Sequence, residues 1–365
     1  MSNPYERSEY DRIRQGWLWP DEYFENDSRK FKFEKQLGEG AFGEAWLVKR
    51  EVEGRVVQRF VAKFALDTED PAMAETIQTE KEMAQKLYGA MHIAQPIVAD
   101  GKMLELDSYT PSLLRLILMM EFIPGITIGE FWYRTLDDEA RWQPIPNRML
   151  WLIFRCMVRA LFALAAPPRK PFGETNEEPT LEPMPEHEPT NDDYQILHND
   201  MNRNNLMFGD LDSGEHSLVP LLKVIDFGVA RDSSEWKNQN RTITQQNIRD
   251  VGDAMKKLYL DESPNLDEDL KALVDQCRDR QPQNRPTLAA LWGRIQNAIT
   301  VKTGPMHFTG KPRAMYESND RISQYVQALI LDASYQIPPP SAGPSPKGKG
   351  VDMQSVSSYS DSDDE

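Results

Sequence analysis

The chain has 365 residues, 39% of them hydrophobic, which is enough for two domains or one two-lobed unit around a substantial core. The formal net charge of −16 and the absence of a basic stripe argue against a nucleic-acid partner. The polar N-terminus and the spacing of the two cysteines, which predicts neither a disulfide framework nor a zinc site, indicate an intracellular protein, cytoplasmic or nuclear.

After a charged N-terminal extension, residues 1–30, the chain reads as a small β-rich lobe. Gly-containing turns separate its first β-like runs, as in a meander. One main helix pattern covers 71–88 and is opened by Pro71. The β-like runs lie at 30–37, 44–52, 56–66, 97–106 and 113–123.

From about residue 127 the periodicity becomes helical, which predicts a larger helical lobe and an α+β fold. The longest apolar run, 149–166, carries Arg155 and Arg159 one turn apart, as expected of a buried helix rather than a membrane span. Helix patterns cover 127–141, 147–165, 243–260, 267–279 and 287–300.

Two segments are predicted to be unstructured because they are too polar to offset the entropy of ordering. One is an acidic, Pro-rich insert at 167–193, and the other is an acidic, Ser-rich tail at 338–365. The predicted units are therefore 1–30, a first lobe at 31–122, a second lobe at 123–300 that contains the insert, a helical extension at 301–337, and the tail.

A glycine-rich turn, Gly38, Gly40 and Gly43 in "LGEGAFGEAWLV", has the spacing G-x-G-x-x-G. A simple hairpin turn would also use such glycines. Because a strand rather than a helix follows Gly43, the context favours a flap over phosphates and not a dinucleotide fingerprint.

Lys63 lies inside the apolar β-like run "RFVAKFAL", where a buried charge needs a partner. An edge-strand lysine is the structural alternative. Glu80 is the favoured partner over Glu75 and Glu82, because Met83 and the apolar residues after it direct Glu80 inward.

Six short motifs follow one another along the chain: "GEGAFGEA", "VAK", "MMEFIPG", "HNDMNRNN", "VIDFGVA" and "DRQPQNRPT". With these motifs, the chain resembles the eukaryotic protein kinases over about residues 31–300. Each motif alone is modest, but six in the same order are specific. The resemblance implies a bilobal fold with an ATP site between the lobes.

The resemblance also implies a role for individual residues in phosphoryl transfer from Mg-ATP. Asp200 would accept the proton of the acceptor hydroxyl, Asn205 and Asp226 would bind Mg²⁺, and Lys63, fixed by Glu80, would hold the ATP phosphates. His198 is interpreted as an anchor of the loop. The nucleotide-binding residues would be Gly38, Gly40, Gly43, Ala62, Lys63, the gatekeeper Met120, the hinge residues Glu121 to Ile123, and Leu206.

Several positions depart from the family pattern. Asn199 replaces the usual Arg before the catalytic Asp, and Asn202 replaces the usual Lys after it, leaving Arg203 as a possible phosphate contact. Asp250 is expected to brace the loop. No A-P-E follows Asp226, and a helix that helps dock protein substrates is missing, so the platform for peptide substrates is trimmed.

These features predict a Ser/Thr protein kinase that uses ATP and Mg²⁺ and whose partner is a protein substrate. Two alternatives stay open: a small-molecule kinase of the choline or aminoglycoside type, favoured by "HND" and the trimmed platform, and a nucleotide-binding pseudokinase scaffold. Because Asn199 carries no charge to pair with a phosphate, activity is predicted to be independent of phosphorylation of the segment after Asp226. The hydroxyls of that segment are Ser233, Ser234, Thr242 and Thr244.

Overall fold

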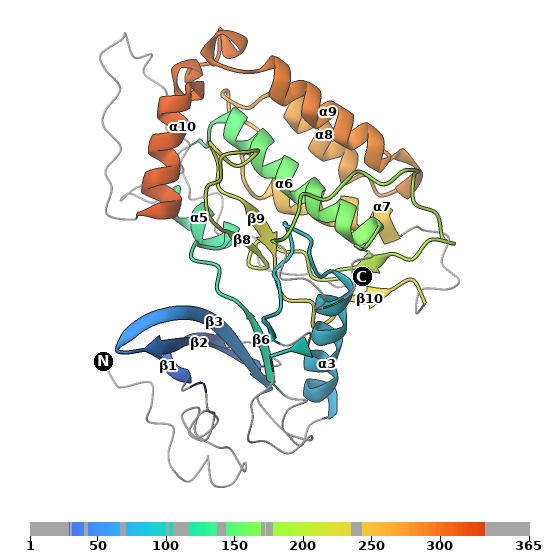
Figure 1. The fold of residues 1–365 in the computed structure, drawn as a ribbon. Helices are drawn as coiled ribbons and strands as arrows, with labels where there is room; N and C mark the ends of the chain where they lie inside the picture. Colours follow the sequence, from blue (N-terminus) through green and yellow to red (C-terminus); the bar gives the residue numbers. More distant parts are fainter. Residues whose placement is uncertain are drawn as a thin grey trace.

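The fold is mixed α+β, as the sequence predicts, and combines a four-stranded antiparallel sheet with seven α-helices in the described part of the chain (Figure 1). The computed structural model describes residues 29, 31–39, 43–65, 71–99, 102–104, 117–136, 144–168, 172, 178–234 and 243–332. The sheet and helix α3 (Pro71–Lys86) lie at the lower end of Figure 1, and most of the other helices lie above them.

The main sheet has the strand order β1-β2-β3-β6, and every pairing is antiparallel. Aromatic and aliphatic side chains alternate toward one face, where Phe31, Trp46, Phe60 and Phe64 form a small core. The strands are β1 (Phe31–Glu39), β2 (Gly43–Val52), β3 (Arg55–Ala65) and β6 (Ile117–Glu121).

The run at 97–106, predicted as one strand, is instead a short hairpin of β4 (Val98–Ala99) and β5 (Lys102–Met103). The run contains the dipeptide Asp-Gly in "DGK", a sequence that favours a two-residue hairpin turn and that the prediction of one strand did not use. The remaining short strands pair as β7 (Ile196–Leu197) with β10 (Arg231–Asp232) and as β8 (Leu206–Phe208) with β9 (Leu222–Val224).

Helix α6 (Asn147–Ala165) is the centre of the larger core. All but three of its 19 residues are buried, so it is a core helix and not an amphipathic surface helix. The other α-helices described after β6 are α5 (Ile128–Arg134), α7 (Ile243–Lys256), α8 (Glu268–Cys277), α9 (Leu288–Val301) and α10 (Asn319–Val326).

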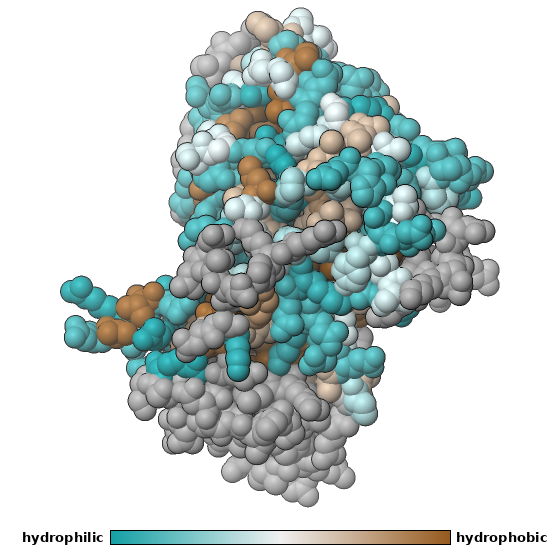
Figure 2. All heavy atoms as spheres, turned by 45° about the vertical axis from the view of Figure 1, so that its right-hand side comes forward, coloured by the Kyte–Doolittle hydropathy of each residue, from teal (hydrophilic) through white to brown (hydrophobic). Residues whose placement is uncertain are grey.

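Helix α5 is shorter than the predicted 127–141: it ends at Arg134, and residues 137–143 lie outside the described part. Beyond α9 the chain forms short 3₁₀ turns before α10, followed by a π-helical turn at Gln327–Leu331. No helix in the described residues is both long and apolar enough to span a membrane. Hydrophilic side chains cover most of the described surface in the view of Figure 2.

The prediction that the acidic insert is unstructured is wrong for its second part, residues 178–193. Glu182 is buried and accepts hydrogen bonds from the backbone N–H of His92 (2.6 Å) and from its ring Nδ1 (2.7 Å). Glu188 accepts the N–H of Leu288 (2.8 Å) at the start of α9. Composition misled the prediction because these acids are satisfied by protein N–H groups instead of water.

Candidate functional site

The ion pair predicted between Lys63 and Glu80 is present. Lys63 lies on β3 and its ammonium donates to the carboxylate of Glu80 on α3. Glu80 shares the buried face of α3 with Ile77 and Met83, whereas the rival acids Glu75 and Glu82 are exposed. The helical period therefore selects one acid of the three.

A second carboxylate also faces this lysine, since Asp226 Oδ1 lies 3.9 Å from Lys63 Nζ. Burial disfavours the charged ammonium, but the negative charges of Glu80 and Asp226 outweigh this and raise the pKa of Lys63. The ammonium of Lys63 therefore stays positively charged beside the exposed carboxylate of Asp226. A negatively charged polyphosphate would require such a positive charge.

The loop at residues 198–205 is fixed by His198, which is fully buried. Its Nε2 lies 3.1 Å from the carbonyl oxygen of Ile225, and its Nδ1 accepts the N–H of Asp200 (3.2 Å). Burial lowers the pKa of His198. A neutral imidazole that donates through Nε2 and accepts through Nδ1 satisfies both contacts, so the ring acts as an anchor, as predicted.

Asp200 itself is exposed, and both of its carboxylate oxygens accept hydrogen bonds from amide groups in the same loop. Asn202 Nδ2 donates to Oδ1 (2.8 Å), and Asn205 Nδ2 donates to Oδ2 (2.8 Å). Because Asn205 uses its N–H groups on Asp200, its carbonyl oxygen is the atom suited to a hard cation.

Asp226 follows β9 with a φ of 64°, a left-handed conformation that directs an exposed carboxylate away from the buried strand. The next two residues hold it there. The ring of Phe227 packs edge-on against His198, with centroids 4.7 Å apart. A Cβ at Gly228 would lie 2.4 Å from Thr76 Cγ2 of α3, so a larger residue would require Thr76 to move.

The backbone of Ile225 connects the two groups of polar residues. Its N–H donates to the carbonyl of Asn205 (3.0 Å), while its own carbonyl accepts from His198. Lys63, Glu80, Asp200, Asn205 and Asp226 therefore belong to one network of contacts, although four separate segments contribute them.

The glycine turn joins β1 and β2, two antiparallel strands, as its context predicts. A Cβ at Gly43 would lie 2.5 Å from the carbonyl oxygen of Phe64, so the hairpin approaches β3 closely. Gly38 pairs with Ala45 across the hairpin, and Gly40 lies outside the described residues.

The other predicted nucleotide-binding residues are mostly apolar and buried, as a purine site requires. The carboxylate of Glu121 is occupied by Lys223 Nζ (2.5 Å) and the N–H of Gln95 (2.7 Å), so only its backbone could contact a ligand. No described residue accepts the N–H of Ile123. The buried members are Ala62, Met120, Ile123 and Leu206.

The prediction that Asp250 braces the loop is wrong, because Asn247, one helical turn earlier on α7, makes these contacts. Asn247 accepts the N–H of His198 (3.3 Å) and donates to the carbonyl of Ile196 (2.8 Å). Asp250 accepts a hydrogen bond from Gln246 (2.8 Å) instead. Burial raises the pKa of Asp250 to about 6.

A junction that sequence reasoning missed orders the segment after Asp226. Asp232 on β10 accepts hydrogen bonds from Lys86 at the end of α3 (2.9 Å) and from the hydroxyl of Tyr194 (3.0 Å). Burial acts to raise the pKa of Asp232, but these bonds and those from Ser234 lower it. No sequence motif links Lys86 to an acid 146 residues away.

The structure describes Arg203 and three of the four hydroxyl residues predicted in the segment after Asp226. The guanidinium of Arg203 lies 5.3 Å from the ring centroid of Trp132 on α5. Thr244 is buried within α7 and donates to Gln195, so it is not an accessible hydroxyl. Ser233 and Ser234 lie on the described segment, and Thr242 lies outside it.

Two cavities in the described part of the chain are not lined by any of the five polar residues, although the second adjoins Asp200. One of about 660 Å³ borders the insert and includes Lys86 and Tyr194. The other, of about 220 Å³, is lined by Asn199 and Asn202, which flank Asp200, and by Asp250 and Asp253 of α7. The contact network, not cavity volume, therefore carries the assignment.

Compared with known proteins, the chain matches no family model, and no curated protein matches it.

Proposed function

We propose that the chain is an ATP-dependent phosphotransferase with a bilobal, protein-kinase-like fold, and that it transfers the γ-phosphate of Mg-ATP to Ser or Thr hydroxyls of proteins. The observation that carries the proposal is the contact network of Lys63, Glu80, Asp200, Asn205 and Asp226. A structural role alone does not require an exposed acid at positive φ beside a partly buried lysine.

The residues suit the two ligands that such a reaction needs. Asn205 and Asp226 offer oxygen atoms, the ligands that Mg²⁺ prefers, and would hold the ion. When bound, Mg²⁺ neutralises charge on the phosphates. The ammonium of Lys63, kept protonated by two carboxylates, would hold the phosphates of ATP.

Asp200 would orient the acceptor hydroxyl and take its proton on a carboxylate oxygen. Two amide hydrogen bonds fix the plane of this carboxylate, so it is positioned before any substrate arrives. The buried, neutral His198 holds the loop from behind and leaves Asp200 as the base.

A small-molecule kinase is the second candidate function. The 220 Å³ cavity beside Asp200 is lined by two acids, Asp250 and Asp253, and by two bases, Arg203 and Lys257, which favours a compact polar acceptor. A scaffold that binds nucleotide without turnover is the third, and the intact set of five polar residues argues against it.

The test incubates the full chain with labelled Mg-ATP, first with basic and acidic test proteins and then with a panel of amines and amino sugars. Glu80→Gln removes the partner of Lys63, and Glu75→Gln on the exposed face of the same helix is its matched control. We expect label on protein hydroxyls with wild type and Glu75→Gln, and a loss of at least tenfold with Glu80→Gln.

Label on a small acceptor alone would identify the second function. ATP binding without transfer to any acceptor would identify the scaffold and contradict the proposal. Equal turnover by Glu80→Gln and Glu75→Gln would show that the Lys63 pair is not part of the active site.

A further inference from the structure

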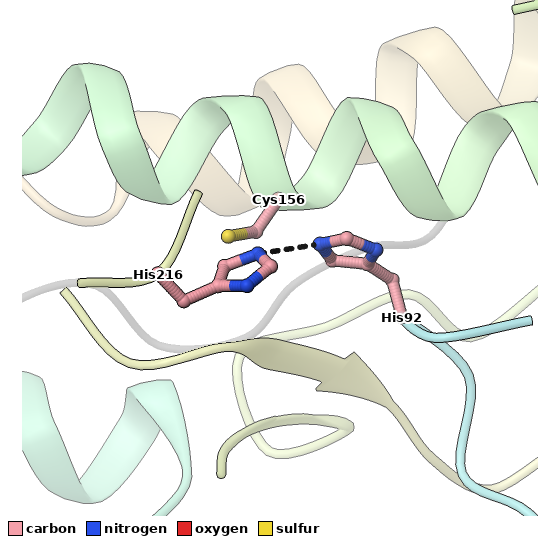
Figure 3. A group of neighbouring side chains, drawn as sticks. All are labelled: His92, Cys156 and His216. Atoms are coloured by element: carbon pink, nitrogen blue, oxygen red, sulfur yellow. Dashed lines mark hydrogen bonds between the residues drawn. The ribbon is translucent and has the colours of Figure 1, made fainter. Parts of the chain in front are cut away.

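A cluster of His92, Cys156 and His216 lies in the core, away from the five polar residues. His92 follows α3, Cys156 is in the middle of α6, and His216 is in the connection between β8 and β9 (Figure 3). All three are buried, and their ligand atoms lie within 4.8 Å of one another. The three positions are about 60 residues apart, so no spacing rule could reveal them.

Both imidazoles are held by carboxylates through Nδ1. His92 Nδ1 lies 2.7 Å from Glu182 Oε2, and His216 Nδ1 lies 2.6 Å from Asp212 Oδ2. Each carboxylate also accepts the backbone N–H of the same histidine, at 2.6 Å and 3.0 Å respectively. An ionised carboxylate only accepts hydrogen bonds, so each Nδ1 carries the proton.

This assignment leaves both Nε2 atoms as lone-pair donors, and they lie only 3.1 Å apart. Two lone pairs directed at each other in a dry core repel unless a cation lies between or beside them. The cation could be an extra proton on one ring or a metal ion bound by both. A single proton serves one pair of atoms, whereas three donor atoms converge here.

The third donor is the sulfur of Cys156. Its Sγ lies within 4.8 Å of the ligand nitrogens of both histidines. A side chain that is only 2% exposed is inaccessible to a substrate, which argues against a nucleophile. A sulfur enclosed in the core beside two imidazole nitrogens is instead placed to bind a metal ion.

We propose that His92, Cys156 and His216 form a zinc site, with His92 and His216 binding through Nε2. Zinc accepts a mixture of imidazole and thiolate ligands, and carboxylates behind both histidines are the usual second layer of such a site. With Zn–N bonds of about 2.0–2.1 Å, tetrahedral geometry separates two nitrogens by about 3.3 Å, close to the 3.1 Å observed.

The site would join four parts of the larger core: α6, the segment after α3, the β8–β9 connection, and the insert through Glu182. Its role would be structural and would not depend on phosphoryl transfer. Within the described residues, neither histidine forms a hydrogen bond with any of the five polar residues of the proposed phosphoryl-transfer site.

The first experiment measures metal content in the full chain, expressed without a histidine tag in medium supplied with zinc. We expect about one zinc ion per chain after extensive dialysis, and a clear fall in Tm when a chelator removes it. His216→Ala is expected to lose the zinc. Wild-type protein that holds no zinc after direct addition of Zn²⁺ would overturn the proposal.

The second experiment identifies the sulfur ligand without depending on a fragile variant. The chain has only two cysteines. Cys277 on α8 is buried, and no histidine is among the groups that shift the pKa of its thiol. In the Cys277→Ala variant, therefore, Cys156 is the only thiol. After zinc is replaced by Co²⁺, we expect this variant to keep a sulfur-to-cobalt charge-transfer band.

Cys156→Ala is expected to lose that band and the bound cobalt. Cobalt that binds to Cys277→Ala without a charge-transfer band would exclude Cys156 as a ligand and overturn the site. Because both experiments record metal binding, their result stands whether or not the chain transfers phosphate. A failed activity assay is thereby distinguishable from a failed metal site.

Discussion

The two polar clusters of this protein are built in opposite ways. In the proposed phosphoryl-transfer site, Asp200 and Asp226 are exposed and their carboxylates are held by loops. In the histidine–cysteine cluster, all three potential ligands are buried and come from three segments that are distant in the sequence. The first arrangement leaves charges available to a ligand, whereas the second encloses them in the core.

The contrast distinguishes side chains that stabilise the fold from side chains that the fold positions for a ligand. Removing an exposed carboxylate leaves no buried polar group without a partner, so the loss should appear in function and not in stability. Removing one member of a buried polar cluster leaves the others without partners, so the cost should fall on stability. The following predictions test this division, beginning with the largest effect.

Asp200→Asn should lower the turnover number by roughly 10²–10⁴, the range for loss of a general base. Melting temperature and Mg-ATP affinity should change little, because the amide keeps the size of the exposed carboxylate. Calorimetric titration beside a turnover assay measures both. Asp210→Asn, an exposed acid beyond the same loop, is the control and should be near wild type. A large fall in Tm would contradict the prediction that Asp200 contributes to function and not to stability.

Replacing residues 178–190 by a Gly/Ser loop should destabilise the fold by about 3–5 kcal/mol, the cost of breaking a buried charged pair. The change removes Glu182 from His92 and Glu188 from the start of α9. Thermal unfolding measures the loss. Deletion of 338–365, which lies outside the described residues, is the comparison and should leave turnover within a few-fold. Equal Tm values for both variants would refute the structural role of the insert.

Asp250→Asn should stabilise the protein by about 1–3 kcal/mol at neutral pH. Burial raises the pKa of this acid from 3.8 to about 6, so between these values the folded protein binds more protons than the unfolded chain. Stability contributed by this group therefore falls as pH rises through that window. The gain should be full above about pH 6 and absent near pH 4.

Denaturant unfolding at several pH values tests this sign. Asp253→Asn on the same helix is the matched control, because Asp253 pairs with Arg278 (2.6 Å) and its loss should not stabilise. A gain from Asp250→Asn that is independent of pH would show that burial of its charge is not the cause.

Removal of all phosphate from the protein should change initial rates by less than tenfold, or about 1.4 kcal/mol in barrier height. The segment after Asp226 is already ordered by Asp232 through Lys86 and Tyr194, and Asn199 Nδ2 donates to the carbonyl of Val229 (3.3 Å). Mass spectrometry confirms dephosphorylation. A larger drop, restored by a phosphate on Ser233 or Ser234, would contradict the prediction.

The sequence was a good guide where chemistry has a local pattern. The β hairpin around Gly43 and the choice of Glu80 over two rival acids followed from periods of two and about 3.6 residues. It was a poor guide where topology decides. Asp250 and Asn247 lie on one helix, and only the packing of α7 against β7 selects the second to hold the loop.

The insert and the histidine–cysteine cluster could not be found by composition or spacing. Acids in a Pro-rich stretch normally indicate solvation, and nothing in the sequence says that Glu182 meets the backbone of His92. Both features depend on contacts across 60 or more residues, and these exist only after the chain has folded.

Helix α3 is fastened at two points, near its middle by Glu80 to Lys63 and at its end by Lys86 to Asp232. A helix held at both places cannot swing outward as a unit without breaking its ion pair with β3 and its ion pair with β10. Under the proposed function, the fold itself sets the geometry of Lys63 and Glu80, and the basal rate of the purified chain should equal its maximal rate.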